Sequence, residues 1–183
     1  INNYRFKNKN QSSILRILSA GTVKQLGARR YCYESSFEYI YSLVDLCHKI
    51  KNLEFELELT VRVRDVKNEI DNKITNAIAN QFKDFVKVSN NIDIKDDIAN
   101  CDCLIALSST TLEEAIVSQI PSMSYGLSKY NHFDFYKSQN FKIRKELRNY
   151  SKLKKIEKLL KRNFIFLTKD KLKREKSIFE FLI

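Results

Sequence analysis

The sequence predicts an α/β fold in which a parallel sheet is wound by helices on both faces. Two observations support this prediction. Segments with a strand pattern and segments with helical spacing alternate about five times along the chain, as they do in consecutive βα units. One strand segment, 103–107, is an unbroken apolar run, which is typical of a parallel strand that is covered on both faces.

The first elements follow from local patterns. The β-prone run 14–18 predicts a strand that ends near Gly21. Ser35 or Ser36 is placed to cap a helix, because apolar residues recur at helical spacing after them. Strict alternation over 57–64 predicts a second strand with one polar face.

The later elements continue this alternation. In chain order they are a helix over 67–82, a strand over 85–88, a helix over 94–100, the buried strand 103–107, a helix over 112–119 and a short strand with its turn over 121–126. In a sheet of this kind, ligands bind beyond the carboxyl ends of the strands. The loops that follow the strands are therefore the predicted location of a site.

Net charge divides the chain into two parts. Lys and Arg number 33 and Asp and Glu number 22, which gives a net charge of +11. Residues 1–136 hold 17 basic and 17 acidic side chains, whereas residues 137–183 hold 16 and 5. We therefore predict a neutral sheet domain over 1–136 and a basic helical extension over 137–183. This distribution argues against a uniformly basic globule that binds nucleic acid.

Several classes of protein are disfavoured by the sequence. There is no run of 18 apolar residues, so no transmembrane helix is predicted. The first residues, 1–5, contain no apolar signal core, and a cytoplasmic location is expected. The chain does not begin with Met, so a truncated product, a processed product or a part of a longer protein is expected.

The cysteines are expected to be free thiols rather than metal ligands. Four cysteines are too sparse for a disulfide-rich secreted scaffold. Cys101 and Cys103 flank Asp102, and alternation predicts that both lie buried on one face of a strand. A single pair of this kind is weak support for a metal site, so no metal is predicted.

Hydroxyl side chains after the buried strand mark the strongest candidate site. They are Ser108, Ser109, Thr110 and Thr111. Amides and the dipole at a helix start favour an anion, so a phosphate or diphosphate fits there. Glu113 or Glu114, in the first turn, is placed to accept hydrogen bonds from ribose hydroxyls. A structural interpretation stays open, in which a threonine caps the helix and a glutamate completes a capping box.

The same segment carries a longer pattern. A strand with the pattern D-x-x-I-x-x-S-S is followed by E-A on a helix and then by a strand that contains Pro. The residues that carry it are Asp102, Ile105, Ser108, Ser109, Glu114, Ala115 and Pro121. With this pattern, residues 102–126 resemble the donor-binding half of GT-B glycosyltransferases, and most of all the bacterial enzymes that build capsule and lipopolysaccharide carbohydrate.

The resemblance implies a Rossmann-like doubly wound domain that forms one GT-B half. It implies transfer of a sugar from a nucleotide donor to a glycan or lipid-linked acceptor. Ser108, Ser109 and Thr110 would contact the donor phosphate, and Glu114, or else Glu113, would contact the nucleoside sugar. No cofactor besides the nucleotide-sugar donor is implied, and the catalytic residues are not predicted.

Partners of the extension follow from the same resemblance. The acceptor domain is expected outside this chain. The basic extension 137–183 is expected either to pack on the sheet domain, to contact the acceptor domain, or to lie on anionic lipid at the inner face of the cytoplasmic membrane.

Glycine and arginine side chains supply further candidates. Gly21, followed by Thr22, stands in the first loop, where a glycine permits close approach of the backbone to the donor phosphates. Arg62 and Arg64 project from the same strand face. They are predicted either to clamp a diphosphate or to form an exposed pair opposite nearby glutamates.

One candidate and one departure concern the donor. His132 follows the last predicted strand, and it is expected either to meet the sugar or base or to have a structural role. Many relatives that use CMP-linked sugars have a His-Pro pair after the second strand. This sequence has Val61 to Asp65 at that place, which disfavours a CMP-sugar donor.

Two other classes of function are also compatible with the sequence. One is a nucleotide-sugar epimerase or hydrolase with the same donor fold. The other is a non-catalytic module that binds a partner or docks on a membrane.

Overall fold

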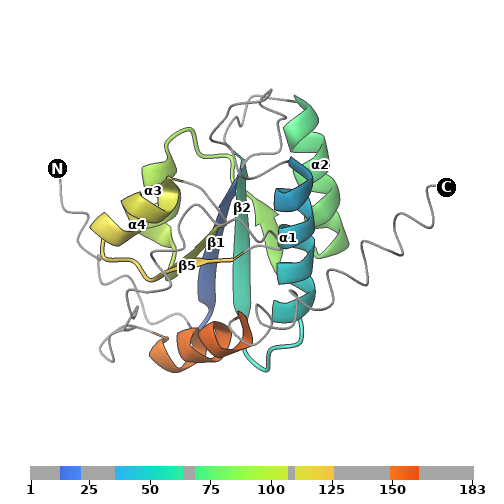
Figure 1. The fold of residues 1–183 in the computed structure, drawn as a ribbon. Coiled ribbons are helices and arrows are strands. Elements are labelled where there is room, and N and C mark those ends of the chain that lie inside the picture. Colours follow the sequence, from blue (N-terminus) through green and yellow to red (C-terminus); the bar gives the residue numbers. More distant parts are fainter. Residues whose placement is uncertain (1–12, 22–35, 64–68, 107–109, 126–148, 161–183) are drawn as a thin grey trace.

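The sheet is parallel throughout and is covered by helices on both faces (Figure 1). The computed structural model describes residues 13–21, 36–63, 69–106, 110–125 and 149–160. Its five strands lie in the order β3-β2-β1-β4-β5, and every neighbouring pair is parallel. The predicted α/β fold with a Rossmann-like, doubly wound sheet is therefore confirmed.

The elements alternate regularly along the chain. They are β1 (Leu15–Gly21), α1 (Ser36–Ile50), β2 (Leu57–Val63), α2 (Glu69–Gln81), β3 (Val86–Val88), α3 (Ile94–Asn100), β4 (Cys103–Ala106), α4 (Thr111–Val117) and β5 (Ser122–Ser124). A further helix spans 150–160. Each strand and helix predicted up to residue 125 is present, with ends that differ by a few residues.

The larger core lies between the sheet and a layer made of α1, α2 and the helix 150–160. Ile17, Leu59 and Ile105 point into this layer from three neighbouring strands and are buried. They meet Leu43 of α1 and Phe82, which directly follows α2. Because side chains alternate along a strand, the residues between them face the other side of the sheet.

The smaller core lies under α3 and α4. Leu18 of β1 and Leu104 of β4 pack there against Ile98 of α3 and Leu112 of α4. The helices α3 and α4 thus cover the part of this face that β1 and β4 form. On the β2–β3 half, Lys87 and Glu58 form an ion pair at 2.7 Å with side chains 55% and 34% exposed. The predicted polar face of the second strand is confirmed.

The helix 150–160 belongs to the larger core. Leu153, Ile156 and Leu160 are buried in it, so this part of the predicted extension packs on the sheet domain. Asn149 precedes the helix with a positive φ of 58° and accepts the amide of Leu153 through its carbonyl at 2.9 Å. An Asn tolerates that backbone conformation better than most residues. The segments 137–148 and 161–183 of the predicted extension lie outside the described residues.

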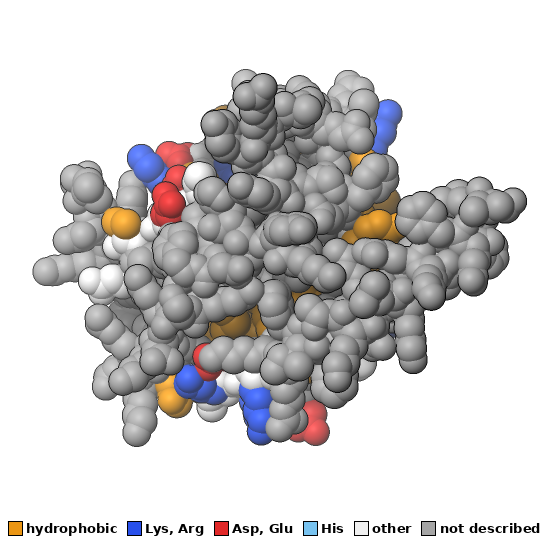
Figure 2. All heavy atoms as spheres, viewed as in Figure 1, with side chains coloured by type: hydrophobic (Ala, Val, Ile, Leu, Met, Phe, Trp, Pro, Cys, Tyr) orange, Lys and Arg blue, Asp and Glu red, His pale blue; other side chains and the backbone are white. Residues whose placement is uncertain are grey.

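The helices and the surface bear on the expectation that the chain has no transmembrane helix. In the described part of the chain, no helix has both the length and the apolar character that crossing a membrane requires. Figure 2 shows the described hydrophobic side chains only as small separate areas on the face it presents.

Burial of the described cysteines is confirmed. Cys47, Cys101 and Cys103 are free and buried. The predicted common face of Cys101 and Cys103 is wrong, because Cys103 packs in the larger core and Cys101 in the smaller one. Strand alternation does not extend to Cys101, since β4 begins only at Cys103.

Candidate functional site

The topological switch point of the sheet lies between β1 and β4. The chain leaves β1 through α1 on one face and reaches β4 through α3 on the other. Gly21 is the last residue of β1, and Ala106 is the last residue of β4. Ligands of open α/β sheets bind beyond the carboxyl ends of the strands at such a point. The two loops singled out in the sequence, after Gly21 and after Ala106, therefore begin at the expected place.

The start of α4 presents polar groups to solvent at this edge. The carbonyl of Thr110 accepts the amides of Glu113 at 3.0 Å and Glu114 at 3.3 Å, so α4 begins directly after it. Thr110, Glu113 and Glu114 are exposed, and Thr111 is half-buried. The predicted helix start is confirmed, and three of these four side chains are open to solvent.

Other members of the sequence pattern have structural positions. The carboxylate of Asp102 accepts the amide of Arg16 at 2.9 Å and so joins the start of β4 to β1. Ala115 of α4 is fully buried in the smaller core. The carbonyl of Pro121 accepts the amide of Leu104 at 2.8 Å. These three positions hold the β4–α4–β5 unit together, and Asp102 lies at the opposite edge of the sheet from the switch point.

Gly21 is explained by packing. A Cβ atom at this position would lie 2.1–2.6 Å from ring atoms of Tyr39, which comes from α1. Real Cβ atoms do not come that close to other heavy atoms, so the ring occupies the space of the missing side chain. The glycine is thus required by α1, and the predicted approach of a ligand to its backbone is not needed to account for it.

Arg62 has a position that neither predicted interpretation anticipated. The residue is only 8% exposed, and its guanidinium forms an ion pair with Asp97 of α3 at 2.5 Å. The Nη1 and Nη2 atoms also donate to the carbonyls of Asn91 and Ile92, at 2.8 and 2.9 Å. The predictions of an exposed pair or a diphosphate clamp are corrected for Arg62, since its guanidinium is turned inward and engaged by protein acceptors.

The loop between β3 and α3 was predicted to lie at the ligand edge, but no residue in it was singled out. In the structure, Ser89 and Asn91 donate to the two carboxylate oxygens of Asp97, each at 2.7 Å. Ile92 is 85% exposed in the same loop. The polar run Ser89–Asn91 ahead of the helix-capping Asp93 was the available signal for an ordered loop.

A small hollow lies on the α1 side of the switch point. Ser19, Ser42, Ala106, Tyr39 and Tyr125 are among its lining residues. The Tyr39 ring takes up the space next to Gly21, and the hollow that the described residues form here is small. Exposed polar groups on α4 make the α4 side the better candidate.

A polar cluster anchors the end of β5 to α1. The hydroxyl of Tyr125 donates to Asp45, and Lys49 contacts both Asp45 and the Tyr125 oxygen. Burial, together with the hydrogen bond to Asp45, raises the pKa of Tyr125 well above its ordinary value. This cluster fixes the point from which the chain continues towards residues 126–133.

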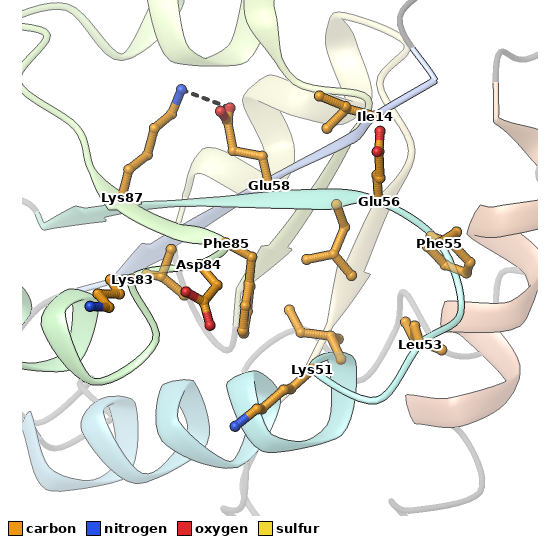
Figure 3. A pocket seen from close by; sticks show the side chains of 13 residues that line it. Ile14, Lys51, Leu53, Phe55, Glu56, Glu58, Lys83, Asp84, Phe85 and Lys87 are labelled. Carbon is orange, nitrogen blue, oxygen red and sulfur yellow. Dashed lines mark ion pairs between the residues drawn. The ribbon is translucent and has the colours of Figure 1, made fainter.

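A larger hollow lies at the opposite edge of the sheet, around the start of β2 (Figure 3). Its volume of about 530 Å³ is in the range of small-molecule sites. Leu53 and Phe85 are among its apolar lining, and Lys51, Lys83 and Asp84 stand at its rim. Because it lies at the amino ends of the strands and its charges are of both signs, it is not the predicted phosphate site.

The positions of five candidate site residues stay predictions. Thr22, Arg64, Ser108, Ser109 and His132 lie outside the described residues. Among the residues that the structure describes, no three His, Cys, Asp or Glu side chains are grouped so as to hold a metal ion.

No protein-family model matches the chain, and no curated protein matches it.

Proposed function

We propose that this chain is the nucleotide-sugar-binding part of a GT-B glycosyltransferase that acts in surface polysaccharide synthesis. The observation that supports the proposal is the exposed polar start of α4, which follows β4 at the switch point. Thr110, Glu113 and Glu114 are exposed at the start of α4, directly beyond the end of β4. A helix start of this kind favours the phosphate of a nucleotide.

The division of labour within the pattern supports the same proposal. Asp102, Ala115 and Pro121 hold β4, α4 and β5 in place, whereas Glu114 is turned to solvent. Structural members therefore account for one part of the pattern. Glu114, the exposed member that the structure describes, has no such role in packing, and the sugar of a bound nucleotide is the partner that we propose for it.

In the proposed reaction, an acceptor hydroxyl forms a new bond to the anomeric carbon of the donor sugar. The bond from that carbon to the phosphate oxygen breaks, and the nucleotide leaves with the electron pair. Hydroxyls and amides at the start of α4 stabilise the negative charge on the leaving phosphate. The acceptor proton passes to a base that we assign to no residue of this chain.

A thermal-shift panel of UDP, GDP, CDP and CMP on the full chain tests nucleotide binding. A ligand present at a hundred times its Kd adds about 2.7 kcal/mol to the stability of the native state, which raises the Tm by several degrees. We expect at least one nucleotide to do so, and we expect Ser109→Ala to reduce the shift. Ser151→Ala, an exposed serine on the helix 150–160, is the matched control. A panel without any shift contradicts the proposal.

Product analysis separates transfer from the other chemistry that this fold supports. With labelled nucleotide sugar and the acceptor half of the enzyme, we expect the label in a glycan or lipid-linked product. Free sugar or an epimerised nucleotide sugar would instead identify a hydrolase or an epimerase. Nucleotide binding without any product would identify a binding module.

We propose that any contact with a membrane surface is made only by charged side chains. The apolar stripe Leu153, Ile156 and Leu160 is buried in the core and is not available to insert into lipid. Lys155 and Lys158 are exposed on the same helix. Binding to anionic vesicles that persists after both lysines are changed to glutamine would place the contact elsewhere in the chain.

A further inference from the structure

A buried ion pair lies directly beneath the loop 89–93. Arg62 projects from β2 on the face covered by α3, and Asp97 meets it from that helix. The two side chains are only 9% and 4% exposed. Both charges are thus shielded from solvent, and their partners must come from the protein.

The partners of this pair come from the loop. Arg62 donates to two successive main-chain carbonyls, those of Asn91 and Ile92. Asp97 accepts the hydroxyl of Ser89 and the side-chain amide of Asn91. The Ser89 hydroxyl in turn accepts the main-chain amide of Asn91 at 3.3 Å. The loop is therefore fastened by the side chains of Ser89 and Asn91 and by the carbonyls of Asn91 and Ile92.

A network of this kind gives a defined conformation more than it gives stability. Replacing a buried ion pair by well-packed apolar residues is often neutral or stabilising, so stability alone does not explain the pair. Ile92 is held outward by the network and is 85% exposed. A loop that is ordered from beneath and presents Ile92 among exposed polar residues on its outer side is preorganised to receive a ligand.

The loop also lies at the correct edge. It follows β3 at the carboxyl end of the sheet, and Arg62 is paired in register with Ala20, one residue before the end of β1. The smaller core continues from there to Ala106 at the end of β4. Loop 89–93 and the start of α4 thus border the same edge of the sheet on the same face.

We propose that Arg62 is a positioning residue for nucleotide binding. Through Asp97 and the carbonyls of Asn91 and Ile92, it holds the loop 89–93 in the shape that a bound nucleotide meets. This inference rests on the proposed function. Arg62 itself does not contact the ligand.

The central test is Arg62→Lys. Lysine keeps the positive charge beside Asp97, but its ammonium group does not reproduce the planar fork that reaches a carboxylate and two carbonyls together. Kd is measured by calorimetry for the nucleotide of the UDP, GDP, CDP and CMP panel that shifts the wild-type Tm most. We expect the variant to bind about tenfold more weakly or worse, because the loop is no longer preorganised.

Leu153→Ala is the control for a loss of stability alone. Leu153 is fully buried in the larger core, on the helix 150–160. We expect this variant to lower the Tm but to keep the wild-type Kd at a temperature where it is folded. An equal loss of affinity in Leu153→Ala would reduce Arg62 to a merely structural residue and overturn the inference.

Ser89→Ala is the second variant if Arg62→Lys does not fold. Ser89 is 5% exposed, so its hydroxyl acts through Asp97 and Asn91 and not on a ligand. We expect a smaller loss of affinity and faster hydrogen exchange of the Asn91 amide.

The outcomes separate this inference from the proposed function. Wild-type Kd in both Arg62→Lys and Ser89→Ala, or in Ser89→Ala alone when Arg62→Lys does not fold, overturns the positioning role and leaves nucleotide binding intact. A wild-type chain that binds none of the four nucleotides overturns both.

Discussion

At the scale of single residues, the contact between Gly21 and Tyr39 leaves no space for a Cβ atom at position 21. The ring of Tyr39 occupies the volume that any side chain at position 21 would need. The backbone of Gly21 does not have a positive φ, so the demand for glycine comes from this contact and not from conformation.

Gly21→Ala is expected to destabilise the protein by about 1–3 kcal/mol, the usual effect of forcing an extra methyl group into a packed site. Tyr39→Ala alone leaves a cavity and is also destabilising. In the double variant the added methyl group has room, so the two losses should not add. Denaturant unfolding of the three variants measures this coupling, and simple additivity would contradict the contact.

Tyr125 is the second residue with a distinct energetic role. Its hydroxyl is buried and donates to Asp45, and its pKa is raised. A raised pKa means that the folded state holds the phenolic proton more tightly than the unfolded state does. Its contribution is therefore fully present below the unfolded value of about 10 and is lost as pH rises above it.

Tyr125→Phe is expected to cost about 1 kcal/mol at pH 7. The difference in unfolding free energy between wild type and variant should shrink as pH rises above 10, because only the wild type has this proton to lose. Urea denaturation at pH 7, 9 and 11 measures it. Tyr41→Phe, at a 57% exposed position on α1, is the control for the loss of a tyrosine hydroxyl.

At the scale of elements, the helix 150–160 is attached to the sheet domain by its apolar side and by two further contacts near its start. Its apolar side is part of the larger core, and Asn149 at its start donates to Asp102 at 3.5 Å. Lys152 stands 5.5 Å from the centre of the Phe55 ring. The helix thus bridges the starts of β4 and β2.

Leu153→Ala should destabilise the protein by about 2–5 kcal/mol, the range for emptying a buried leucine site. Lys155→Ala, two residues along on the exposed side, should change stability by no more than about 0.5 kcal/mol. Thermal unfolding of both variants checks the assignment. Equal effects of the two changes would mean that the helix does not pack as described.

Periodicity predicted the elements well, because each strand and helix up to residue 125 has its own local pattern. It also predicted the polar face of β2. It did not predict that Arg62 is buried, because alternation gives the face of a side chain but not what covers that face. Asp97, which pairs with Arg62, is 35 residues away along the chain. The contact of Gly21 with Tyr39 and the separate faces of Cys101 and Cys103 likewise depend on tertiary packing.

For the whole molecule, the described thiols report on global unfolding. Burial raises the pKa of Cys47 and of Cys101 to about 12, and it raises the pKa of Cys103 well above its ordinary value. The thiolate is the reactive form, and all three side chains are inside the cores.

Iodoacetamide at pH 8 should therefore label these three cysteines only as fast as the protein unfolds. Site-resolved mass spectrometry measures each rate, and all three rates should rise together when urea is added. Rapid labelling of one of them in the native state would contradict its place in the core. If the labelling rates of Cys101 and Cys103 rise to the same extent, the two cores unfold as one unit.

The edge strand β3 has a further consequence for the molecule in solution. It is three residues long, and its outward residue Lys87 remains 55% exposed despite its ion pair. A short edge that carries a lysine offers little backbone for a second copy to pair with. We therefore expect this border of the sheet to resist strand-to-strand aggregation when the protein is concentrated.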